Sequence, residues 1–444
     1  MFKYPSGFYV DVRIEESMHT RITFKKMDLH EQKIRKHKGA FVRLFDGNRW
    51  YYASTTNLNE IQKKIDELAS IATPHAEIND HPIVKAFEVH QENMISYDQK
   101  DISSIELHEK QKLLHSFAQL FDHPIIVNYI STYVDQKMIK SIYSSKGSQI
   151  AFDKQSCGVL FRFELLDGEN KEQASISKGV VFFDDLKTIA SDIKKEIEKN
   201  IDFVKNAEAV VPGQYPVLLS PLATGVFTHE SFGHKSESDF MVGDETMKAE
   251  WALGKKIGPS ILTIIDNGQI PGNGYVPFDD EGTKGHKTYI ITKGELTGRL
   301  HSASTAALLE EPVTANARAM NFEFEPIVRM TTTYIEKGEQ SLEEIIQSMS
   351  HGIFVDTIKH GSGMSTFTIA PARAYMIENG KITKPVKISV VSGNVFETLA
   401  EIDAVSKEFE LFGFVGGGCG KMEQFPLPVG FGGPYTRVKK LYVQ

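Results

Sequence analysis

Apolar and polar residues alternate through the first fifty positions of the chain in short runs, of which residues 7–14 are the clearest. Alternation with a period of two is typical of strands that bury one face of a sheet. The pair Asp46-Gly47 stands between two such runs, and this dipeptide favours the tight turn of a β-hairpin. The beginning of the chain is therefore predicted to form an antiparallel sheet.

A helical period follows this sheet. After Asn57, apolar residues recur every three or four positions, at Leu58, Ile61, Ile65 and Leu68. This spacing predicts an amphipathic helix that covers the sheet. A second helix is predicted over residues 105–117, and a long amphipathic helix is predicted over residues 184–209.

The stretch Val210-Val211-Pro212-Gly213 divides the chain, because proline and glycine together stop a helix before the strand predicted at residues 215–220. Farther on, strand-like runs are separated by turn sequences, at Asp266-Asn267-Gly268, Lys293-Gly294 and Asn379-Gly380. We therefore predict an α+β fold with two domains. Residues 1–211 would form an N-terminal α/β domain with an antiparallel sheet and covering helices, and residues 212–444 a β-rich C-terminal domain.

Composition and charge narrow the class of protein. The chain is 41% hydrophobic and 24% charged, which are globular values, and its net charge of −8 repels the backbone of nucleic acids. The basic run at residues 33–38 lacks aromatic side chains and is predicted to be a solvated hairpin face. The sequence shows no signal-peptide pattern, no apolar run of about 18 residues, and too few cysteines for a disulfide framework. We expect a cytosolic protein that binds neither membranes nor nucleic acid.

Residues 229–234 have the sequence His-Glu-Ser-Phe-Gly-His and are the first candidate for chemistry. Neutral imidazoles bind zinc, and a neighbouring carboxylate can move the proton of an attacking water molecule. His229 and His234 are therefore candidate metal ligands, and Glu230 is a candidate catalytic group. The alternative is a surface helix with two chance histidines, since the chain has 15 histidines in all.

The spacing of the two histidines is unusual. Histidines four residues apart lie about 40° apart around an α-helix, whereas His229 and His234, five residues apart, would lie about 140° apart. A π-type turn, with bonds between residues i and i+5, would bring both imidazoles to one face, and such turns concentrate at functional sites. We predict this distortion here, and Gly233 is the residue that tolerates it most easily. Glu237, three residues after His234, is a further ligand candidate or a partner of a ligand.

The second candidate region is the glycine-rich stretch of residues 413–421, which contains Cys419. A phosphate-binding loop is disfavoured, because Met422 follows Lys421 where that motif needs serine or threonine, and prolines follow where it needs a helix. A thiolate on a glycine-rich loop would make a good third zinc ligand. The alternative is that Cys419 is an inert buried thiol.

Four motifs, in this order, carry a resemblance to a known family: His229-Glu-Ser-Phe-Gly-His234 with Glu237 and Asp239; Asp279-Asp-Glu-Gly-Thr283; Tyr375-Met-Ile-Glu-Asn-Gly-Lys-Ile-Thr-Lys-Pro385; and Cys419-Gly-Lys with Pro428-Val-Gly430. Together they resemble the TldD/PmbA (TldE) peptidases over roughly residues 215–444. The PmbA-like sister chains lack the His-Glu-x-x-x-His residues, so this chain resembles the catalytic, TldD-like members. Ser231 stands where a small alanine is usual.

The resemblance implies a zinc ion held by His229, His234 and Cys419, with Glu230 as the catalytic carboxylate. It also implies a dimer, with a second copy or with a sister subunit, around an enclosed chamber in which small or unfolded peptides are cleaved. The rival hypothesis is a non-catalytic regulatory protein with a structural metal, of the gyrase-modulator type. The acidic run Asp279-Asp280-Glu281 is interpreted as a solvated turn, although the resemblance implies that it lies near the site.

Overall fold

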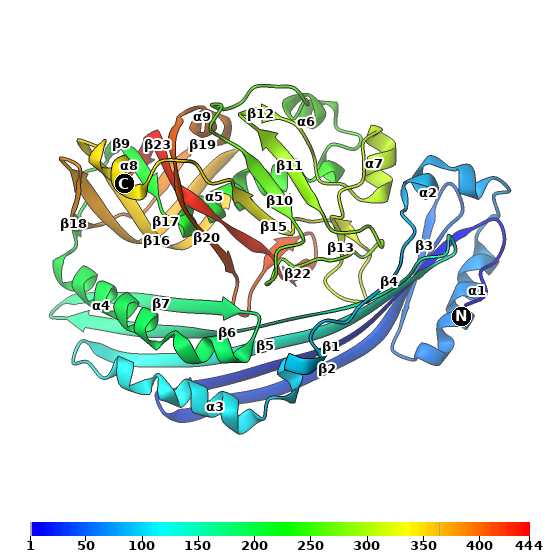
Figure 1. Ribbon diagram of the computed structural model, residues 1–444, viewed down its shortest axis with the longest axis horizontal. Coiled ribbons are helices and arrows are strands. Elements are labelled where there is room, and N and C mark those ends of the chain that lie inside the picture. The colour runs from blue at the N-terminus through cyan, green and yellow to red at the C-terminus, as the bar shows by residue number, and fades with distance from the viewer. Residues whose placement is uncertain (1, 364) are drawn as a thin grey trace.

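The computed structural model describes residues 2–363 and 365–444, and these form two sheet-based layers (Figure 1). The first layer is a long, curved sheet with strand order β3-β2-β1-β5-β6-β4 and with β7 paired to β6. Its strands are β1 (Tyr9–Lys25), β2 (Asp28–Phe45), β3 (Trp50–Thr55), β4 (Gln91–Met94), β5 (Ile126–Ser144), β6 (Gln149–Asp167) and β7 (Asn170–Val180). All neighbours pair antiparallel except β4, which runs parallel to β6. The antiparallel sheet predicted for the beginning of the chain is confirmed.

Helices cover the face of this sheet that points away from the rest of the molecule. Helices α3 (Leu107–Ser116) and α4 (Ala190–Asn206) lie across its outer face, and α1 (Ile61–Ile71) and α2 (Pro82–Ala86) lie at one end (Figure 1). The predicted apolar stripe of α1 is buried at Ile61, Ile65 and Leu68. The helix predicted over residues 184–209 is shorter than expected: a 3₁₀ turn, η6 (Phe183–Thr188), precedes α4, and Glu208 already lies in a strand.

The second layer is a mixed sheet with strand order β12-β11-β10-β15-β23-β9-β16-β17-β18-β8, to which β19 and β20 also pair. The strands are β8 (Glu208–Ala209), β9 (Gly213–Leu219), β10 (Ile264–Asn267), β11 (Lys287–Thr292), β12 (Glu295–Leu296), β15 (Thr332–Ile335), β16 (His351–Gly363), β17 (Thr366–Glu378), β18 (Lys381–Lys387), β19 (Val391–Asn394), β20 (Ile402–Gly413) and β23 (Gly430–Val443). Two small ladders lie beside it, β13 (Ala317–Arg318) with β14 (Ile327–Val328) and β21 (Cys419–Lys421) with β22 (Gln424–Leu427). The β-rich second half is therefore confirmed.

Short helices complete this half: α5 (Pro221–Thr228), α6 (Glu245–Glu250), α7 (Ala303–Leu309), α8 (Leu342–Gln347) and α9 (Val395–Ala400). The turns predicted at Lys293-Gly294 and Asn379-Gly380 have positive φ at both residues, as tight hairpins require. The turn predicted at Asp266-Asn267-Gly268 is present, at the end of β10, but it opens a long connection rather than a tight hairpin, because β11 begins only at Lys287. Asp266 is itself a buried strand residue.

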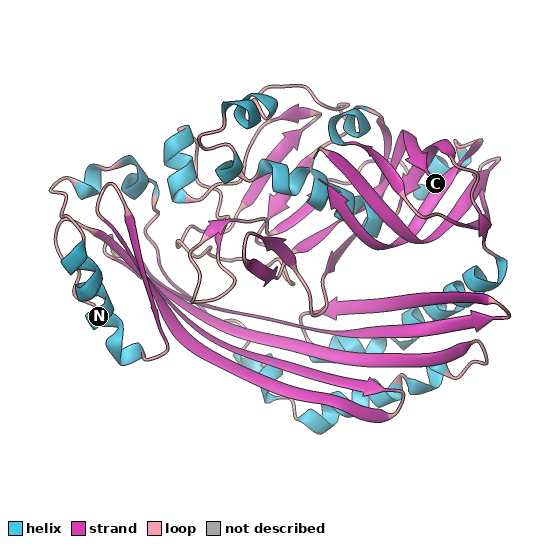
Figure 2. Ribbon diagram, turned by 180° about the vertical axis from the view of Figure 1, so that it is seen from behind, coloured by secondary structure: helices cyan, strands magenta, loops and turns pink. Residues whose placement is uncertain are grey.

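Figure 2 shows the long strands of the first sheet passing beneath the second layer, with the small ladders between the two. Separate apolar cores lie within each half, one between the first sheet and helices α3 and α4, and a larger one around the second sheet. None of the helices in the described part of the chain combines the length and apolar character that crossing a lipid bilayer requires. The boundary placed between residues 211 and 212 stays a prediction.

Candidate metal centre

The two histidines directly follow helix α5, and the residues at the beginning of this helix favour helix initiation. Ser220 caps it through its hydroxyl oxygen, which accepts a hydrogen bond from the N–H of Ala223 at 3.3 Å, and Pro221 occupies the first turn. Nearly every residue of α5 is buried, and the helix packs against β23 and β16. The segment that follows is thus held by a rigid, buried element.

A π-helical turn, η7 (His229–Gly233), continues α5. The backbone N–H of His234 donates to the carbonyl oxygen of His229, five residues earlier, which is the distortion that the spacing predicts. The two imidazole rings end 5.2 Å apart between centroids. The role expected for Gly233 is wrong, because its φ of −55° is ordinary for any residue. Glycine is needed for space instead: a Cβ atom there would lie 1.8 Å from Sδ of Met330.

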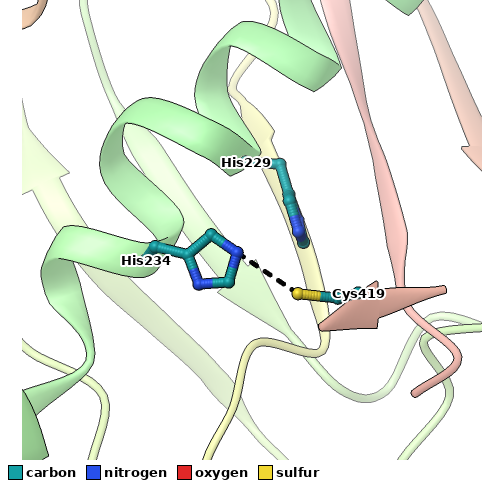
Figure 3. A group of neighbouring side chains, drawn as sticks. All are labelled: His229, His234 and Cys419. Atoms are coloured by element: carbon teal, nitrogen blue, oxygen red, sulfur yellow. Dashed lines mark hydrogen bonds between the residues drawn. The ribbon is translucent and has the colours of Figure 1, made fainter. Parts of the chain in front are cut away.

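Cys419 reaches the histidines from a different part of the chain. It begins β21, and Nη2 of Arg329 fixes its carbonyl oxygen with a hydrogen bond of 2.8 Å. Its Sγ lies 3.3 Å from Nε2 of His234, a residue 185 positions away (Figure 3). Ligand atoms of His229, His234 and Cys419 all lie within 4.8 Å of one another. The structure therefore brings together the three residues that the sequence singled out.

Cys419 and His234 each stabilise the charged form of the other. Burial alone would raise the pKa of Cys419, but hydrogen bonds and charges from His229 and His234 outweigh it and lower this pKa to about 5. Burial alone would lower the pKa of His234, yet its hydrogen bonds with Cys419 and Glu237 raise it to about 10. These contacts therefore favour the thiolate form of Cys419, and the thiolate is the form that binds metal.

This donor set fits a zinc ion. Two imidazoles and a thiolate are ligands that zinc prefers, and Nδ1 of His229 is buried without a hydrogen-bond partner in the described structure. Cys157, the other cysteine, lies elsewhere on β6. Three protein donors are the number found in catalytic zinc sites, which keep a fourth position open, whereas structural sites fill all four.

The two carboxylates of this segment have different surroundings. Glu230 lies within the π-turn and is partly exposed. Glu237 is completely buried, with its Oε2 3.2 Å from Nδ1 of His234 and 3.0 Å from Nζ of Lys421. Nζ of Lys421 also donates to Asp239 at 2.6 Å. Lys421 was not singled out from the sequence, where only its position two residues after Cys419 hinted at a role.

The acidic run at residues 279–281 is not a solvated turn, so that interpretation is wrong. Asp279, Asp280 and Glu281 are all buried, and Arg43 of β2 donates to Glu281 at 2.8 Å. Nζ of Lys140, on β5, lies 2.5 Å from Oδ1 of Asp280. The run therefore joins the second layer to the long sheet.

A cavity of about 470 Å³ lies between the long sheet and the second layer. Its walls include Phe414, Val415, Gly416 and Gly417 from the glycine-rich loop, together with Pro428. The three candidate ligands do not line it, but Gly417 is only two residues before Cys419, which is about 7 Å at most between Cα atoms. The cavity thus ends close to the candidate metal centre.

Comparisons with known proteins identify the family of the chain. The chain is 30% identical to a metalloprotease of Synechocystis over 98% of this chain and 94% of that protein. It is also 30% identical to a zinc metalloprotease, a TldD homolog of Saccharolobus solfataricus, over 100% and 99%. Among solved structures, its fold is similar to TldE of Thermococcus kodakarensis, with a TM-score of 0.76 and 16% identity over 98% and 96% of the two chains.

A second solved structure, a candidate modulator of a DNA gyrase from Thermotoga maritima, has a TM-score of 0.77 at 17% identity and covers 99% of this chain and 96% of that one. Two family models match the sequence directly. The model of PmbA/TldA metallopeptidase domain 1 matches residues 10–72, and the model of the PmbA/TldA metallopeptidase C-terminal domain matches residues 212–444. The chain therefore belongs to the PmbA/TldD family of metallopeptidases.

Proposed function

We propose that the chain is a zinc-dependent peptidase, with His229, His234 and Cys419 as the zinc ligands and Glu230 as the catalytic carboxylate. The observation that carries this proposal is the meeting of three donor atoms within 4.8 Å, from two segments that are far apart in the sequence. The zinc named for the Saccharolobus relative supports the choice of metal. With these residues present, the chain corresponds to the catalytic, TldD-like member of the family.

A bound zinc ion would polarise the scissile carbonyl and lower the pKa of water toward about 7. Glu230 then accepts the proton of the attacking water at its carboxylate oxygen and returns it to the leaving amine. This role suits Glu230 better than Glu237, because Glu237 is held by His234 and Lys421 whereas Glu230 is partly exposed. The two carboxylates therefore have separate tasks.

The substrates that fit are small or unfolded peptides. A cavity of about 470 Å³ is large enough for a few residues of an extended peptide and far too small for a folded domain. A dimer would close this space further into a chamber, with either a second copy or a TldE-like sister subunit as the partner. The similarity to the fold of TldE makes the sister subunit a natural candidate.

The rival function is a regulatory protein with a purely structural metal. The three-donor site argues against it, because a structural zinc ion usually has four protein ligands. Salt-dependent binding of the pure protein to DNA would favour this rival, and its absence at low salt would exclude the gyrase-modulator form.

One set of variants tests the proposal. Glu230→Gln should keep stoichiometric zinc and lose peptide cleavage by at least about a hundredfold, since general-base catalysis contributes about that much or more. Cys419→Ser should lose both zinc and cleavage, and Cys157→Ser, the matched control at the other cysteine, should keep both. Zinc is measured by elemental analysis and cleavage with unfolded peptides, with and without a chelator. Full activity of the Glu230→Gln protein would contradict the catalytic role proposed for Glu230.

A further inference from the structure

The floor of the cavity is an ordered grid of side chains on the long sheet. His19 is paired with Arg35 across β1 and β2, Ser17 with His37, and Arg21 with Lys33. Residues opposite each other in an antiparallel pair lie on the same face, and alternate residues along a strand share that face. All six of these side chains line the cavity.

This grid carries more positive than negative charge. The acid Glu31 is shared by two of the cations, Arg21 at 3.2 Å and Lys33. Within the described residues, Arg35 has no salt bridge. Three further acids, Glu15, Asp135 and Glu323, also line the cavity. Arg35 is therefore the cation of this grid that no carboxylate pairs with in the described structure.

The next strands extend the same positive face. Met138 of β5 lines the cavity and is paired with Lys154 of β6, so Lys154 lies on that face as well. Burial first, and then the charges of Lys140 and Arg318, outweigh the opposite effect of Asp280 and Glu15 and lower the pKa of Lys154 to about 7. The pKa of His19 is lowered by burial and by the charges of His37, Arg35 and Lys154, which outweigh the opposite effect of Asp135. These groups repel one another, and an anion between them would relieve that repulsion.

The roof of the cavity connects this grid to the candidate metal centre. A Cβ atom on Gly416 would lie 3.4 Å from Nη1 of Arg21, and one on Gly158 of β6 would lie 2.8 Å from Cγ2 of Val415. The glycine-rich loop thus rests directly on the sheet, three to four residues before Cys419. A peptide that extends from the metal centre into the cavity would pass beside this loop and over the grid.

We propose that this grid, around Arg35, His19 and His37, is a subsite for a carboxylate of the peptide substrate. This inference rests on the proposed peptidase function and adds the substrate class that the site prefers. The carboxylate has two sources, the side chain of an aspartate or glutamate and the free C-terminus of the peptide. In both cases it would form charge-assisted hydrogen bonds with the guanidinium of Arg35.

The test measures the binding of labelled peptides to zinc-loaded, full-length Glu230→Gln protein by fluorescence anisotropy. This variant is used so that the peptides are not cleaved during the measurement. Three peptides differ only in their charge: one with glutamate and a free C-terminus, one with glutamine in its place, and one with an amidated C-terminus. We expect about tenfold weaker binding on loss of the carboxylate that is recognised. A change with glutamine assigns the side chain, and a change on amidation assigns the C-terminus.

Variants of β2 assign the effect to the grid. In Arg35→Gln protein, the affinity ratio between the charged and neutral peptides should fall toward one. Lys36→Gln is the matched control, because Lys36 is the next residue, is equally exposed, and points to the opposite face of the strand. Equal affinity for all three peptides would overturn the proposal, and so would an equal loss of discrimination in the Arg35→Gln and Lys36→Gln proteins.

Discussion

Glu237 fixes the second imidazole of the candidate metal centre. Its carboxylate contacts Nδ1 of His234, which leaves Nε2 facing Cys419. Burial alone would raise the pKa of Glu237, but the hydrogen bond with His234 and the charge of Lys421 outweigh it and lower this pKa. A carboxylate behind a ligating histidine sets its tautomer and its orientation. We therefore expect Glu237 to position His234 rather than to act in catalysis.

Replacing Glu237 by glutamine should therefore weaken zinc binding by about tenfold to a hundredfold without removing a ligand. Zinc affinity is measured by competition with a chromophoric chelator. Glu250→Gln is the control, because Glu250 pairs with Lys235, the neighbour of His234, at 2.6 Å and does not contact the candidate ligands. If the two variants held zinc equally well, the carboxylate of Glu237 would have no part in orienting His234.

At the scale of single residues, the sequence predicted site residues best where the side chain has a characteristic chemistry. His229, Glu230, His234 and Cys419 could be selected because imidazole, carboxylate and thiolate groups form hydrolytic metal sites. Their roles as ligands and catalyst remain predictions. Lys421 could not be selected, since a lysine is usually solvated, and only the fold shows that it is buried against Glu237 and Asp239.

Among the elements, the π-turn depends on close packing as much as on hydrogen bonding. Met330 is fully buried against Gly233, so a methyl group at that position must displace either the turn or the methionine. We expect Gly233→Ala to lower the free energy of unfolding by about 1–3 kcal/mol and to reduce zinc content, because the turn carries both histidines. Urea denaturation and elemental analysis measure these two effects.

Met330→Ala provides the matched background for this variant. If the contact with Met330 is the cause, adding Gly233→Ala to Met330→Ala protein should cost clearly less than it does alone, a coupling that a double-mutant cycle detects. Equal costs in both backgrounds would show that glycine is needed at this position for some reason other than space.

The elements themselves were predicted unevenly. The helix at residues 61–71 and the bulged turn at residues 229–233 were confirmed, because local periodicity and spacing determine them. The great length of β1 and β2, with 17 and 18 residues, was not visible in the sequence. The charged residues at positions 33–38 predicted a solvated face, and this prediction is confirmed. The sequence did not indicate that part of this segment also lines the cavity. Its second role depends on a layer contributed by the far end of the chain.

At the scale of the whole molecule, the contact between the two layers was the least predictable feature. Asp280 meets Lys140, which is 140 residues away, and Glu281 meets Arg43, which is 238 residues away. Burial alone would raise the pKa of Asp280, but Lys140 and Arg13 outweigh it and hold this pKa well below its usual range. An acidic run without its partners resembles a solvated turn, and only the assembled fold shows that these charges are buried and paired.

This contact yields a prediction about stability. The guanidinium of Arg43 lies 2.7 Å from Asp11 and 2.8 Å from Glu281, and all three side chains are at most 5% exposed. Arg43→Met leaves two buried carboxylates without their cation, so the free energy of unfolding should fall by about 3–5 kcal/mol. Urea denaturation measures the change, and the slope of the transition shows whether the two layers still unfold together.

Two further variants separate the buried charge from a general effect on the sheet. Lys38→Met removes a cation that pairs with Glu16 on the same two strands, where both side chains are more than half exposed, and it should change stability little. Adding Glu281→Gln to Arg43→Met should cost less than the sum of the single changes, because it removes one of the unpaired charges. Equal destabilisation by Lys38→Met and Arg43→Met would mean that the buried pair of Arg43 with Glu281 does not help to hold the two layers together.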